Sequence, residues 1–404
     1  MYVFIFIALY LQIFFLISFI EGRFGKKSPR QNLRNRSRFP SVTIVVPCWN
    51  EERTVASTLR SLLSLDYPKE KLSLVVVDDG STDGTLSIAR RFEKYTNVRV
   101  YSKENGGKHT AVNFALEKSS SEFFGCLDAD SFVEPDALKK IISNFEDPSV
   151  MAVTPAIQVK NPRTLVQRAQ KIEYIMGLFM RSALSFLNAI QVTPGPFSIF
   201  RKRVFEELGP YKRAHGTEDL EIALRMHKNR YRIINAPDAH VFTVSPHTIR
   251  ALLKQRLRWS QGFLENALDY REMFFRKTYG NFGIFTLPIT FLFVFFTLYA
   301  TGMAIFSLFR DFLEKIERVR TIGITPINFS LDWFYLNTQA LFFVAIALFC
   351  LFILSIYFGH ALARHRSLHI GDLLLFIVLY PFIVPIFLAR AVWNTSLSKK
   401  AEWR

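Results

Sequence analysis

The sequence has few cysteines, and their arrangement predicts neither a disulfide framework nor a zinc site. The three cysteines, Cys48, Cys126 and Cys350, are odd in number and widely separated along the 404-residue chain. Two fall within predicted strands and one within an apolar run, so buried reduced thiols are the simplest explanation. The cysteine-dense pattern of small secreted domains is therefore absent.

Acidic residues are scarce relative to basic ones. The chain has 51 Lys and Arg against 34 Asp and Glu, which gives a formal net charge of +17. Such a charge favours an anionic partner, which is nucleic acid, anionic lipid or a phosphorylated substrate. Zinc-finger spacings, homeodomain-like patterns and RNP aromatic motifs are all missing, so we expect no nucleic-acid partner.

Charge is missing altogether from the N-terminal stretch Tyr2–Ile20. Its length is close to the ~20 residues that a helix needs to cross a bilayer, which predicts a transmembrane helix over residues 1–21. A cleaved signal peptide fits poorly, because no basic region precedes the run and no small-residue cleavage site follows it. From Glu21 to Arg38 the chain has one acid against seven bases, and we predict a basic linker over residues 22–40; the bases are Arg23, Lys26, Lys27, Arg30, Arg34, Arg36 and Arg38. The positive-inside rule then predicts a cytosolic domain after it.

The C-terminal part has two further stretches without charge, residues 278–309 and 333–359. Both are long enough to span a bilayer. A third run, Leu373–Ala389, contains two prolines, so it is either a kinked span or a re-entrant segment. We predict three transmembrane helices within residues 278–396, followed by a tail over residues 397–404.

Between these apolar regions, short β-branched runs alternate with helix-like stretches. The predicted strands are Val42–Trp49, Leu72–Asp78, Val98–Ser102 and Phe123–Asp128. The predicted helices between them are Arg53–Leu65, Asp83–Lys94 and Gly107–Lys118. This order predicts a Rossmann-like, mostly parallel α/β sheet in a domain over residues 41–245.

Two helical segments are expected near the membrane. Apolar residues recur at three- and four-residue steps from Leu165 to Leu187, which predicts an amphipathic helix. This helix either packs on the sheet or lies against the membrane surface. Residues 246–275 are predicted to form interfacial helices.

Two pairs of acids come directly after predicted strands. They are Asp78 with Asp79, and Asp128 with Asp130. Because the carboxyl ends of parallel strands meet at one edge of a sheet, both pairs are expected to face one crevice. Close carboxylates stay ionised most easily beside a cation, and oxygen ligands suit Mg²⁺ or Mn²⁺. The alternative for the second pair is an Asp-rich turn.

Phosphate-binding features are expected at the same edge. Pro47 and Glu51 lie at the end of the first predicted strand, and Gly106-Gly107-Lys108 precedes a predicted helix. Glycines allow a close approach of the backbone, and a helix N-terminus and a lysine favour anions. A Gly-Gly pair is also common in simple turns. Carboxylates beside such a cradle indicate a metal-bound nucleotide diphosphate.

Two later motifs contribute polar side chains. Glu218 and Asp219 begin a helical stretch, where a carboxylate is often only a cap. Gln255, Arg258 and Trp259 share one face of a predicted helix. A guanidinium beside an indole suits a diphosphate next to a sugar ring. The alternative is an interfacial membrane anchor, which Arg and Trp also form.

Taken in order, these motifs resemble those of the inverting family 2 glycosyltransferases of GT-A fold. The series is Asp78-Asp79, Asp128-x-Asp130, Thr217-Glu218-Asp219 and Gln255-x-x-Arg258-Trp259. Within that family the chain resembles the membrane-integrated hyaluronan, cellulose, chitin and poly-N-acetylglucosamine synthases. The resemblance implies a cytosolic α/β GT-A domain between transmembrane helices of the plasma membrane, with a UDP-sugar donor and Mg²⁺ or Mn²⁺.

The resemblance also implies roles for individual residues. The nucleotide and diphosphate of the donor would be bound by Pro47, Glu51, Asp78, Asp79, Asp128 and Arg258, with Lys108 beside them. Asp128 and Asp130 would hold the metal, and Asp219 would be the general base. The acceptor would be bound near Gly195, Pro196, Glu218, Gln255 and Trp259.

Three functions are compatible with these motifs. The first is a processive synthase that extends a β-linked polysaccharide and passes it across the bilayer. The small number of spans favours UDP-N-acetylglucosamine as its donor, alone or alternating with UDP-glucuronic acid. The second is transfer of one sugar to a membrane lipid such as ceramide or polyprenyl phosphate. The third is a non-enzymatic scaffold, which the presence of every expected acid disfavours.

Overall fold

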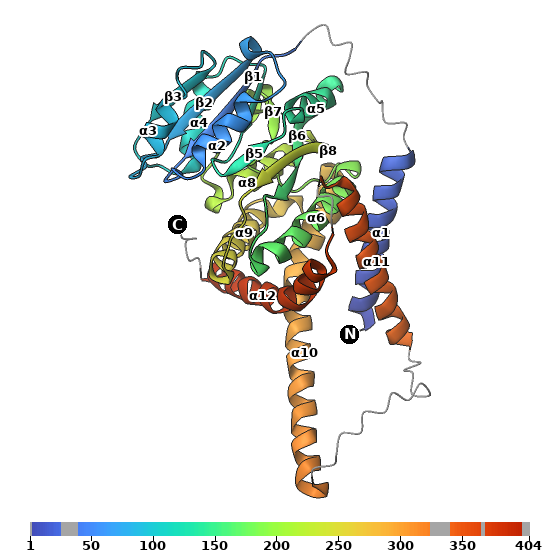
Figure 1. The fold of residues 1–404 in the computed structure, drawn as a ribbon. Helices are drawn as coiled ribbons and strands as arrows, with labels where there is room; N and C mark the ends of the chain where they lie inside the picture. Colours follow the sequence, from blue (N-terminus) through green and yellow to red (C-terminus); the bar gives the residue numbers. More distant parts are fainter. Residues whose placement is uncertain (1, 26–38, 324–339, 365–367, 398–404) are drawn as a thin grey trace.

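The protein consists of an α/β domain standing over a group of long apolar helices (Figure 1). The computed structural model describes residues 2–25, 39–323, 340–364 and 368–397. Most of the predicted basic linker and of the predicted C-terminal tail lies outside the described residues.

An eight-stranded sheet of order β3-β2-β1-β4-β7-β6-β8-β5 forms the centre of the domain. Its strands are β1 (Val42–Cys48), β2 (Leu72–Asp78), β3 (Val98–Ser102), β4 (Phe123–Cys126), β5 (Ser131–Val133), β6 (Val150–Val159), β7 (Ile199–Arg201) and β8 (Arg232–Thr243). Strands β1 to β4 are parallel, as the sequence predicts. Strand β7 runs antiparallel to both of its neighbours, and β5 runs antiparallel to β8, so the other half of the sheet is mixed. The predicted α/β class is confirmed, with β4 ending two residues before the predicted end.

Helices cover both faces of the sheet, because successive side chains of a strand point to opposite faces. Ile44, Leu74 and Val76 pack under α2 (Val55–Leu63), α3 (Thr85–Arg90) and α5 (Ala137–Ser143). Val45, Val75 and Val77 pack under α4 (Lys108–Lys118), α7 (Arg203–Leu208) and α8 (Glu218–Lys228). The sheet therefore lies between two apolar cores, and its loops at the carboxyl ends of β1, β2 and β4 are left free to form a site.

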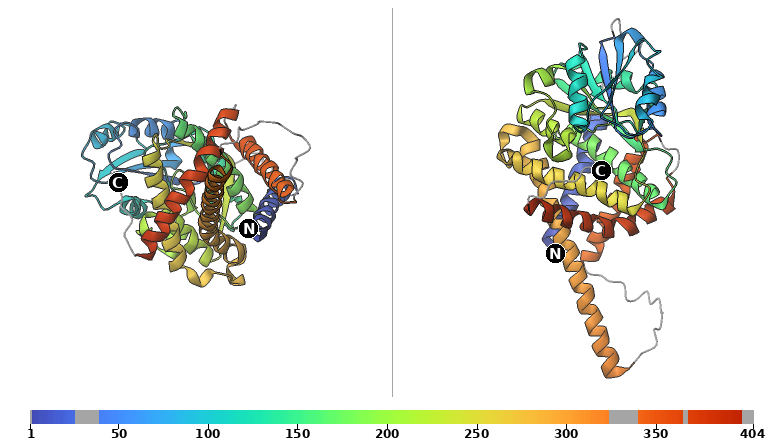
Figure 2. Two further views of the ribbon diagram at one scale, coloured as in Figure 1. Left: turned by 90° about the horizontal axis from the view of Figure 1, so that it is seen from below. Right: turned by 90° about the vertical axis from the view of Figure 1, so that its left-hand side faces the viewer.

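Among the residues that the structure describes, four helices are long and apolar enough to cross a membrane. They are α1 (Tyr2–Ile20), α10 (Leu287–Ile322), α11 (Ala340–Leu362) and α12 (Ile370–Ser396). Helices α1 and α11 lie side by side, and the Gln12 side-chain amide donates to the Ser355 hydroxyl at 2.6 Å. Helix α10 extends away from the domain in both side views (Figures 1 and 2).

Helix α12 has a different direction from the other three. It is a single helix that continues through Pro381 and Pro385, without the break that a re-entrant hairpin needs. In both side views it runs across the base of the domain, transverse to α10 (Figures 1 and 2). That α12 spans the membrane stays a prediction.

The predicted amphipathic helix is present as α6 (Leu165–Phe186), and it begins with a capping box between Thr164 and Gln167. It packs on β6 and β8 on one side and on α1, α11 and α12 on the other. The expected packing of α6 on the sheet is present, and α6 also packs on three of the apolar helices. That α6 lies against a membrane surface stays a prediction. The predicted interfacial segment contains α9 (Ile249–Asp269), which packs along α12.

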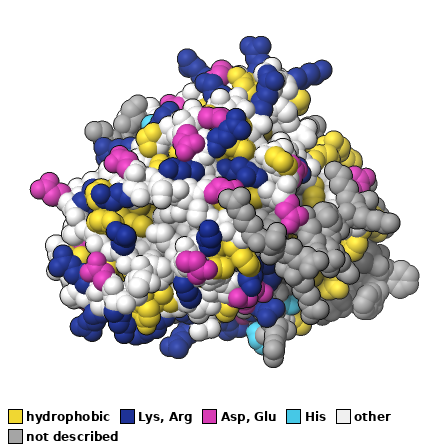
Figure 3. All heavy atoms as spheres, turned by 90° about the horizontal axis from the view of Figure 1, so that it is seen from above, with side chains coloured by type: hydrophobic (Ala, Val, Ile, Leu, Met, Phe, Trp, Pro, Cys, Tyr) yellow, Lys and Arg dark blue, Asp and Glu magenta, His cyan; other side chains and the backbone are white. Residues whose placement is uncertain are grey.

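The end of the domain that is farthest from α10 has the surface of a water-facing protein. Lysine and arginine side chains are spread over it with acids between them, and hydrophobic side chains occur singly or in small groups (Figure 3). Such mixed charge suits contact with solvent rather than with lipid.

The packing of α11 on α6 predicts a position-specific effect of a single methyl group. A Cβ on Gly359 would lie 2.2 Å from the carbonyl oxygen of Ile175, whereas a Cβ on Gly302 of α10 would meet nothing within 4 Å. We expect Gly359→Ala to separate the two helices and destabilise the protein by about 1–3 kcal/mol, the usual cost of overpacking. Gly302→Ala should be neutral or slightly stabilising. Thermal unfolding in detergent measures both, and equal melting temperatures would contradict the close packing.

Candidate active site

The strand ends bring the predicted acids to one edge of the sheet. Cys48 of β1 lies opposite Asp78 of β2, and Val45 of β1 lies opposite Cys126 of β4. Asp79 and Asp128 follow these strands directly and therefore face the same crevice. The convergence of the two acidic pairs, expected from the sequence, is present in the structure.

Asp79 is buried, and it holds the glycine loop that follows β3. Its Oδ1 accepts hydrogen bonds from Lys103 Nζ at 2.6 Å and from the Gly106 amide at 3.1 Å. Its Oδ2 accepts from the Gly107 amide at 2.8 Å, and Gly107 has a φ of 91°, which requires glycine. Lys103 was not predicted from the sequence to be a site residue. Its position just before the Gly106-Gly107 pair is a signal that could have identified it. Asp79 thus holds the Gly106-Gly107 loop in place and also faces the crevice at the edge of the sheet.

Asp78 keeps one oxygen without a partner. Its Oδ2 accepts from the Ser81 amide and the Ser102 hydroxyl, both at 3.3 Å. Its buried Oδ1 has no hydrogen-bond partner among the described residues. A buried carboxylate oxygen is normally satisfied, so this atom is suited to accept from a bound ligand such as a nucleobase N–H. Pro47 and Glu51 lie at the same edge, at the end of β1 and just beyond it.

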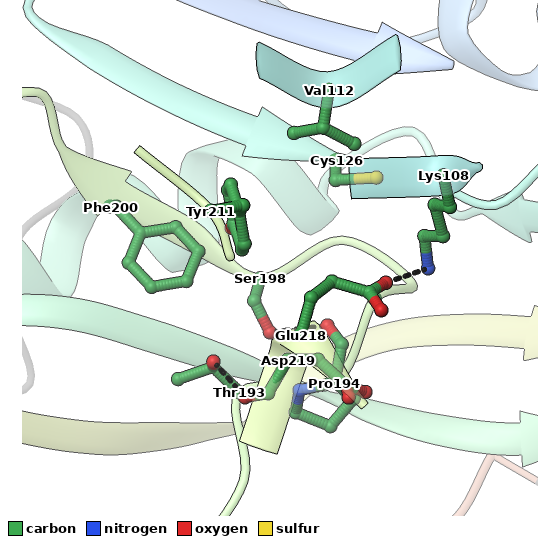
Figure 4. A pocket seen from close by; sticks show the side chains of 11 residues that line it. Lys108, Val112, Cys126, Thr193, Pro194, Ser198, Phe200, Tyr211, Glu218 and Asp219 are labelled. Carbon is green, nitrogen blue, oxygen red and sulfur yellow. Dashed lines mark hydrogen bonds and ion pairs between the residues drawn. The ribbon is translucent and has the colours of Figure 1, made fainter. Parts of the chain in front are cut away.

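Lys108, at the start of α4, lies between two carboxylates. Its Nζ is 2.6 Å from Asp128 Oδ1. The same Nζ is 3.4 Å from Glu218 Oε1 (Figure 4). Burial disfavours its charge, but Asp128 and Glu218 outweigh burial and raise the pKa of Lys108 well above its usual value. Gly195 leaves room for the lysine side chain, because a Cβ at position 195 would lie 2.4 Å from Lys108 Nζ. Pro196 follows it in the same loop.

Asp219 lines the same cavity as Lys108, Gly195 and Glu218 (Figure 4). Thr217 is the N-cap residue of α8, so neither acid occupies the cap position that was the alternative. The Asp219 carbonyl accepts from the Thr193 amide at 3.1 Å and hydroxyl at 2.8 Å, which anchors the turn. Burial and the neighbouring Glu218 raise the pKa of Asp219 to about 6, against the opposing effects of Lys108 and Arg258. A carboxylate with a pKa near neutrality is suited to general-base catalysis.

The loops around the cavity contain strained backbone. Phe197, which is fully buried, has a φ of 67°, and Ala214 and His215 have φ values of 47° and 53°. Each such conformation costs on the order of 1–3 kcal/mol in a non-glycine residue and needs support from its surroundings. Phe197 receives it from β4, where its amide donates to the Cys126 carbonyl at 2.6 Å. The strained residues flank Gly195 and the turn that contains Asp219.

The acids can hold a divalent cation only together with a ligand. Asp128 and Asp130 lie one residue apart, and no group of three or more His, Cys, Asp or Glu converges among the described residues. Magnesium and manganese are commonly held by one or two carboxylates, with substrate phosphates and water completing the shell. The donor set therefore fits a cation that arrives with a diphosphate.

Helix α9 backs the turn that contains Asp219. Arg258 Nη1 donates to the Gly216 carbonyl at 3.0 Å. Gly262 packs against Thr217, where a Cβ would approach to 2.4 Å of the hydroxyl. The Asn266 amide donates to the same hydroxyl at 3.0 Å. Three successive turns of α9 thus contact the turn that contains Asp219.

One contact of α9 was not predicted. The guanidinium that lies over the Trp259 ring is that of Arg256, at 4.2 Å from the ring centroid. Residues three apart share a face of a helix, which places Arg256 beside Trp259. Arg256 also donates to Gln255 Oε1 at 2.7 Å. It was overlooked in the sequence although it lies inside the motif.

The chain is similar in sequence to known proteins over much of its length. Residues 43–209 match the pattern of glycosyl transferase family 2. The chain is 32% identical over 266 residues to a poly-beta-1,6-N-acetyl-D-glucosamine synthase of Staphylococcus epidermidis, covering 64% of each chain. A synthase of the same name from Staphylococcus aureus strain COL is 32% identical over 232 residues, covering 56% of each. The chain thus spans less than two thirds of the length of these relatives.

The fold agrees with a solved structure over almost the whole chain. A mannosyltransferase from Pyrobaculum calidifontis, solved in complex with GDP-Man and Mn²⁺, aligns with a TM-score of 0.63 and 22% sequence identity. The alignment covers 98% of this chain and 99% of the mannosyltransferase, so it includes the flanking helices. At this identity the likeness shows the fold, and the GT-A architecture expected from the motifs is confirmed.

The raised pKa of Asp219 predicts a stability effect. Because the folded-state pKa lies above the ordinary value of 3.8, an ionised Asp219 destabilises the fold at every pH above about 6. We expect Asp219→Asn to raise the melting temperature at pH 8, and the gain to shrink as the pH falls through about 6. Thermal unfolding across pH measures it. The control is Asp66→Asn, whose side chain is 67% exposed and should change little. No gain at pH 8 would contradict the buried charge.

Proposed function

We propose that this chain, which contains a family 2 glycosyltransferase domain, polymerises N-acetylglucosamine from UDP-N-acetylglucosamine into a β-linked polysaccharide at a membrane. The observation that supports it most is the half-buried Asp219 beside the Lys108–Asp128–Glu218 cluster, in a domain seated on apolar helices. The choice of donor rests on the poly-N-acetylglucosamine synthases that the chain resembles.

The donor would occupy the edge of the sheet. The free oxygen of Asp78 would accept from the uracil, with Asp79, Pro47 and Glu51 around the nucleoside. Lys108 and Arg258 would lie near the diphosphate. A Mg²⁺ or Mn²⁺ ion held by Asp128 and Asp130 would neutralise charge on the diphosphate when bound.

The chemical step needs one base and one stabilised leaving group. Asp219 would remove the proton from an acceptor hydroxyl as its oxygen attacks the anomeric carbon. The bond from that carbon to the diphosphate oxygen breaks, and UDP leaves with the electron pair. Lys108 and Arg258 favour the charge that develops on UDP. Attack from the opposite face turns an α-linked donor into a β-linked product, without a covalent enzyme intermediate.

Product size tests this proposal. Purified protein incubated with single UDP-sugars and Mg²⁺ or Mn²⁺ should release UDP fastest from UDP-N-acetylglucosamine and yield a long polymer. The Asp219→Asn variant should lose at least about 100-fold in UDP release, the usual effect of a general base, while keeping donor affinity. A lipid-extractable product with one sugar would instead establish transfer to a lipid. Polymer formed at an undiminished rate by Asp219→Asn would remove Asp219 from the mechanism.

We also propose that α1, α10 and α11 cross the plasma membrane and that the catalytic domain is cytosolic. The charge-free part of α10 is followed by charged turns at the end that lies farthest from the domain (Figure 1). Charged residues there suit the aqueous phase on the opposite side of the bilayer.

Cysteine labelling distinguishes the two sides. In a Cys350→Ser background, Lys315→Cys near the end of α10 should react with a membrane-impermeant maleimide in intact cells. Lys94→Cys on the domain should react only after permeabilisation, although both positions are exposed. Labelling of Lys94→Cys in intact cells would overturn the proposed orientation.

A further inference from the structure

Three helices meet at a charged contact outside the catalytic cavity. The guanidinium of Arg256 on α9 forms a bidentate ion pair with the carboxylate of Glu173 on α6. Nε of Arg256 lies 2.9 Å from Oε1, and Nη2 lies 2.5 Å from Oε2. The hydroxyl of Tyr380, in the apolar helix α12, donates to the same Oε2 at 2.6 Å. The two-pronged geometry is the strongest that an arginine and a carboxylate form.

Two of the three side chains in this contact are shielded from water, while the Glu173 side chain is 30% exposed. The Arg256 side chain is 6% exposed, and Tyr380 is 8% exposed. A buried ion pair contributes little net stability compared with an apolar substitute, but removal of one partner leaves an uncompensated charge. Such a contact is therefore suited to hold side chains in one arrangement.

The side chains that Arg256 holds are those of the Gln255–Trp259 motif. Nη1 of Arg256 donates to Gln255 Oε1 at 2.7 Å, and the guanidinium lies 4.2 Å from the centroid of the Trp259 ring. One guanidinium thus binds Glu173 along one edge, Gln255 along another and the indole on its face. Trp259 remains 39% exposed, which leaves the other side of its ring available to a ligand.

We propose that Glu173 and Tyr380 are positioning residues that set the orientation of Trp259, and hence the binding of the acceptor sugar, through Arg256. This inference rests on the proposed function and on the acceptor-binding role that the family resemblance implies for Trp259 and Gln255. Neither Glu173 nor Tyr380 touches the donor site. Through the Tyr380 hydroxyl, which donates to Glu173, α12 contributes to the geometry of the acceptor site.

The loss of that hydroxyl should affect the acceptor and spare the donor. Tyr380→Phe keeps the ring, which packs on Phe376 with centroids 4.3 Å apart, and removes only the hydrogen bond to Glu173. We expect Tyr380→Phe and Glu173→Gln to raise the KM for an added oligosaccharide acceptor about three- to tenfold, the usual size of such indirect coupling. The KM for UDP-N-acetylglucosamine should stay within about twofold.

A matched variant on the same helix separates positioning from general docking of α12. Asn394 also lies on α12, and its side-chain amide donates to Gln261 of α9 at 3.2 Å, without contact to Arg256. Asn394→Ala should leave both KM values unchanged. If Asn394→Ala and Tyr380→Phe raise the acceptor KM equally, α12 acts only by docking, and the inference is wrong.

A spectroscopic readout works without turnover. The fluorescence emission of Trp259 is obtained by subtracting the spectrum of the Trp259→Phe variant from that of the same protein with Trp259. This difference is measured once in the wild-type background and once in the Tyr380→Phe background. It should shift to longer wavelength when Tyr380→Phe loosens Arg256, and it should not shift with Asn394→Ala. An unchanged Trp259 emission in Tyr380→Phe overturns the inference. Absence of polymer from the wild-type protein, with the shift intact, would overturn the proposed function alone.

Discussion

The acidic end of the cavity depends on one ammonium group. Asp128 follows β4, whereas Glu218 and Asp219 begin α8, and Lys108 on α4 is the cation that lies within reach of Asp128 and Glu218. Without it, burial and mutual repulsion would favour protonated carboxyls. Gly195 is part of the same arrangement, because any side chain there would occupy the position of the ammonium. Within this cluster, burial and Glu218 raise the pKa of Asp219 to about 6, against the opposing effect of Lys108.

Helix α9 connects this cluster to the membrane side of the protein. One of its faces supports the turn before Asp219 through Arg258, Gly262 and Asn266. Another face meets α6 and α12 through Arg256. A shift of the apolar helices would therefore reach the catalytic turn and the Trp259 ring through the same rigid rod, which is how packed elements transmit displacement.

Much of this could be predicted from the sequence, because period and spacing report directly on local structure. The strands from Val42 to Cys126 follow from apolar runs, and the meeting of Asp79 with Asp128 follows from parallel topology. The antiparallel β7 could not be predicted, since three residues show no periodicity. The Lys103–Asp79 and Arg256–Glu173 pairs were missed because they join residues far apart in sequence, and no pattern in one chain encodes such a contact.

The length of α10 has a geometric consequence. A helix of 36 residues at about 1.5 Å rise per residue is about 54 Å long, whereas the hydrocarbon core of a bilayer is about 30 Å thick. If α10 crosses the bilayer upright, its last turns stand well clear of the lipid as a stalk bearing alternating charges, including Arg310, Glu314 and Arg318. Such a stalk would hold whatever it meets beyond the membrane at a fixed height above the point where the chain leaves the lipid.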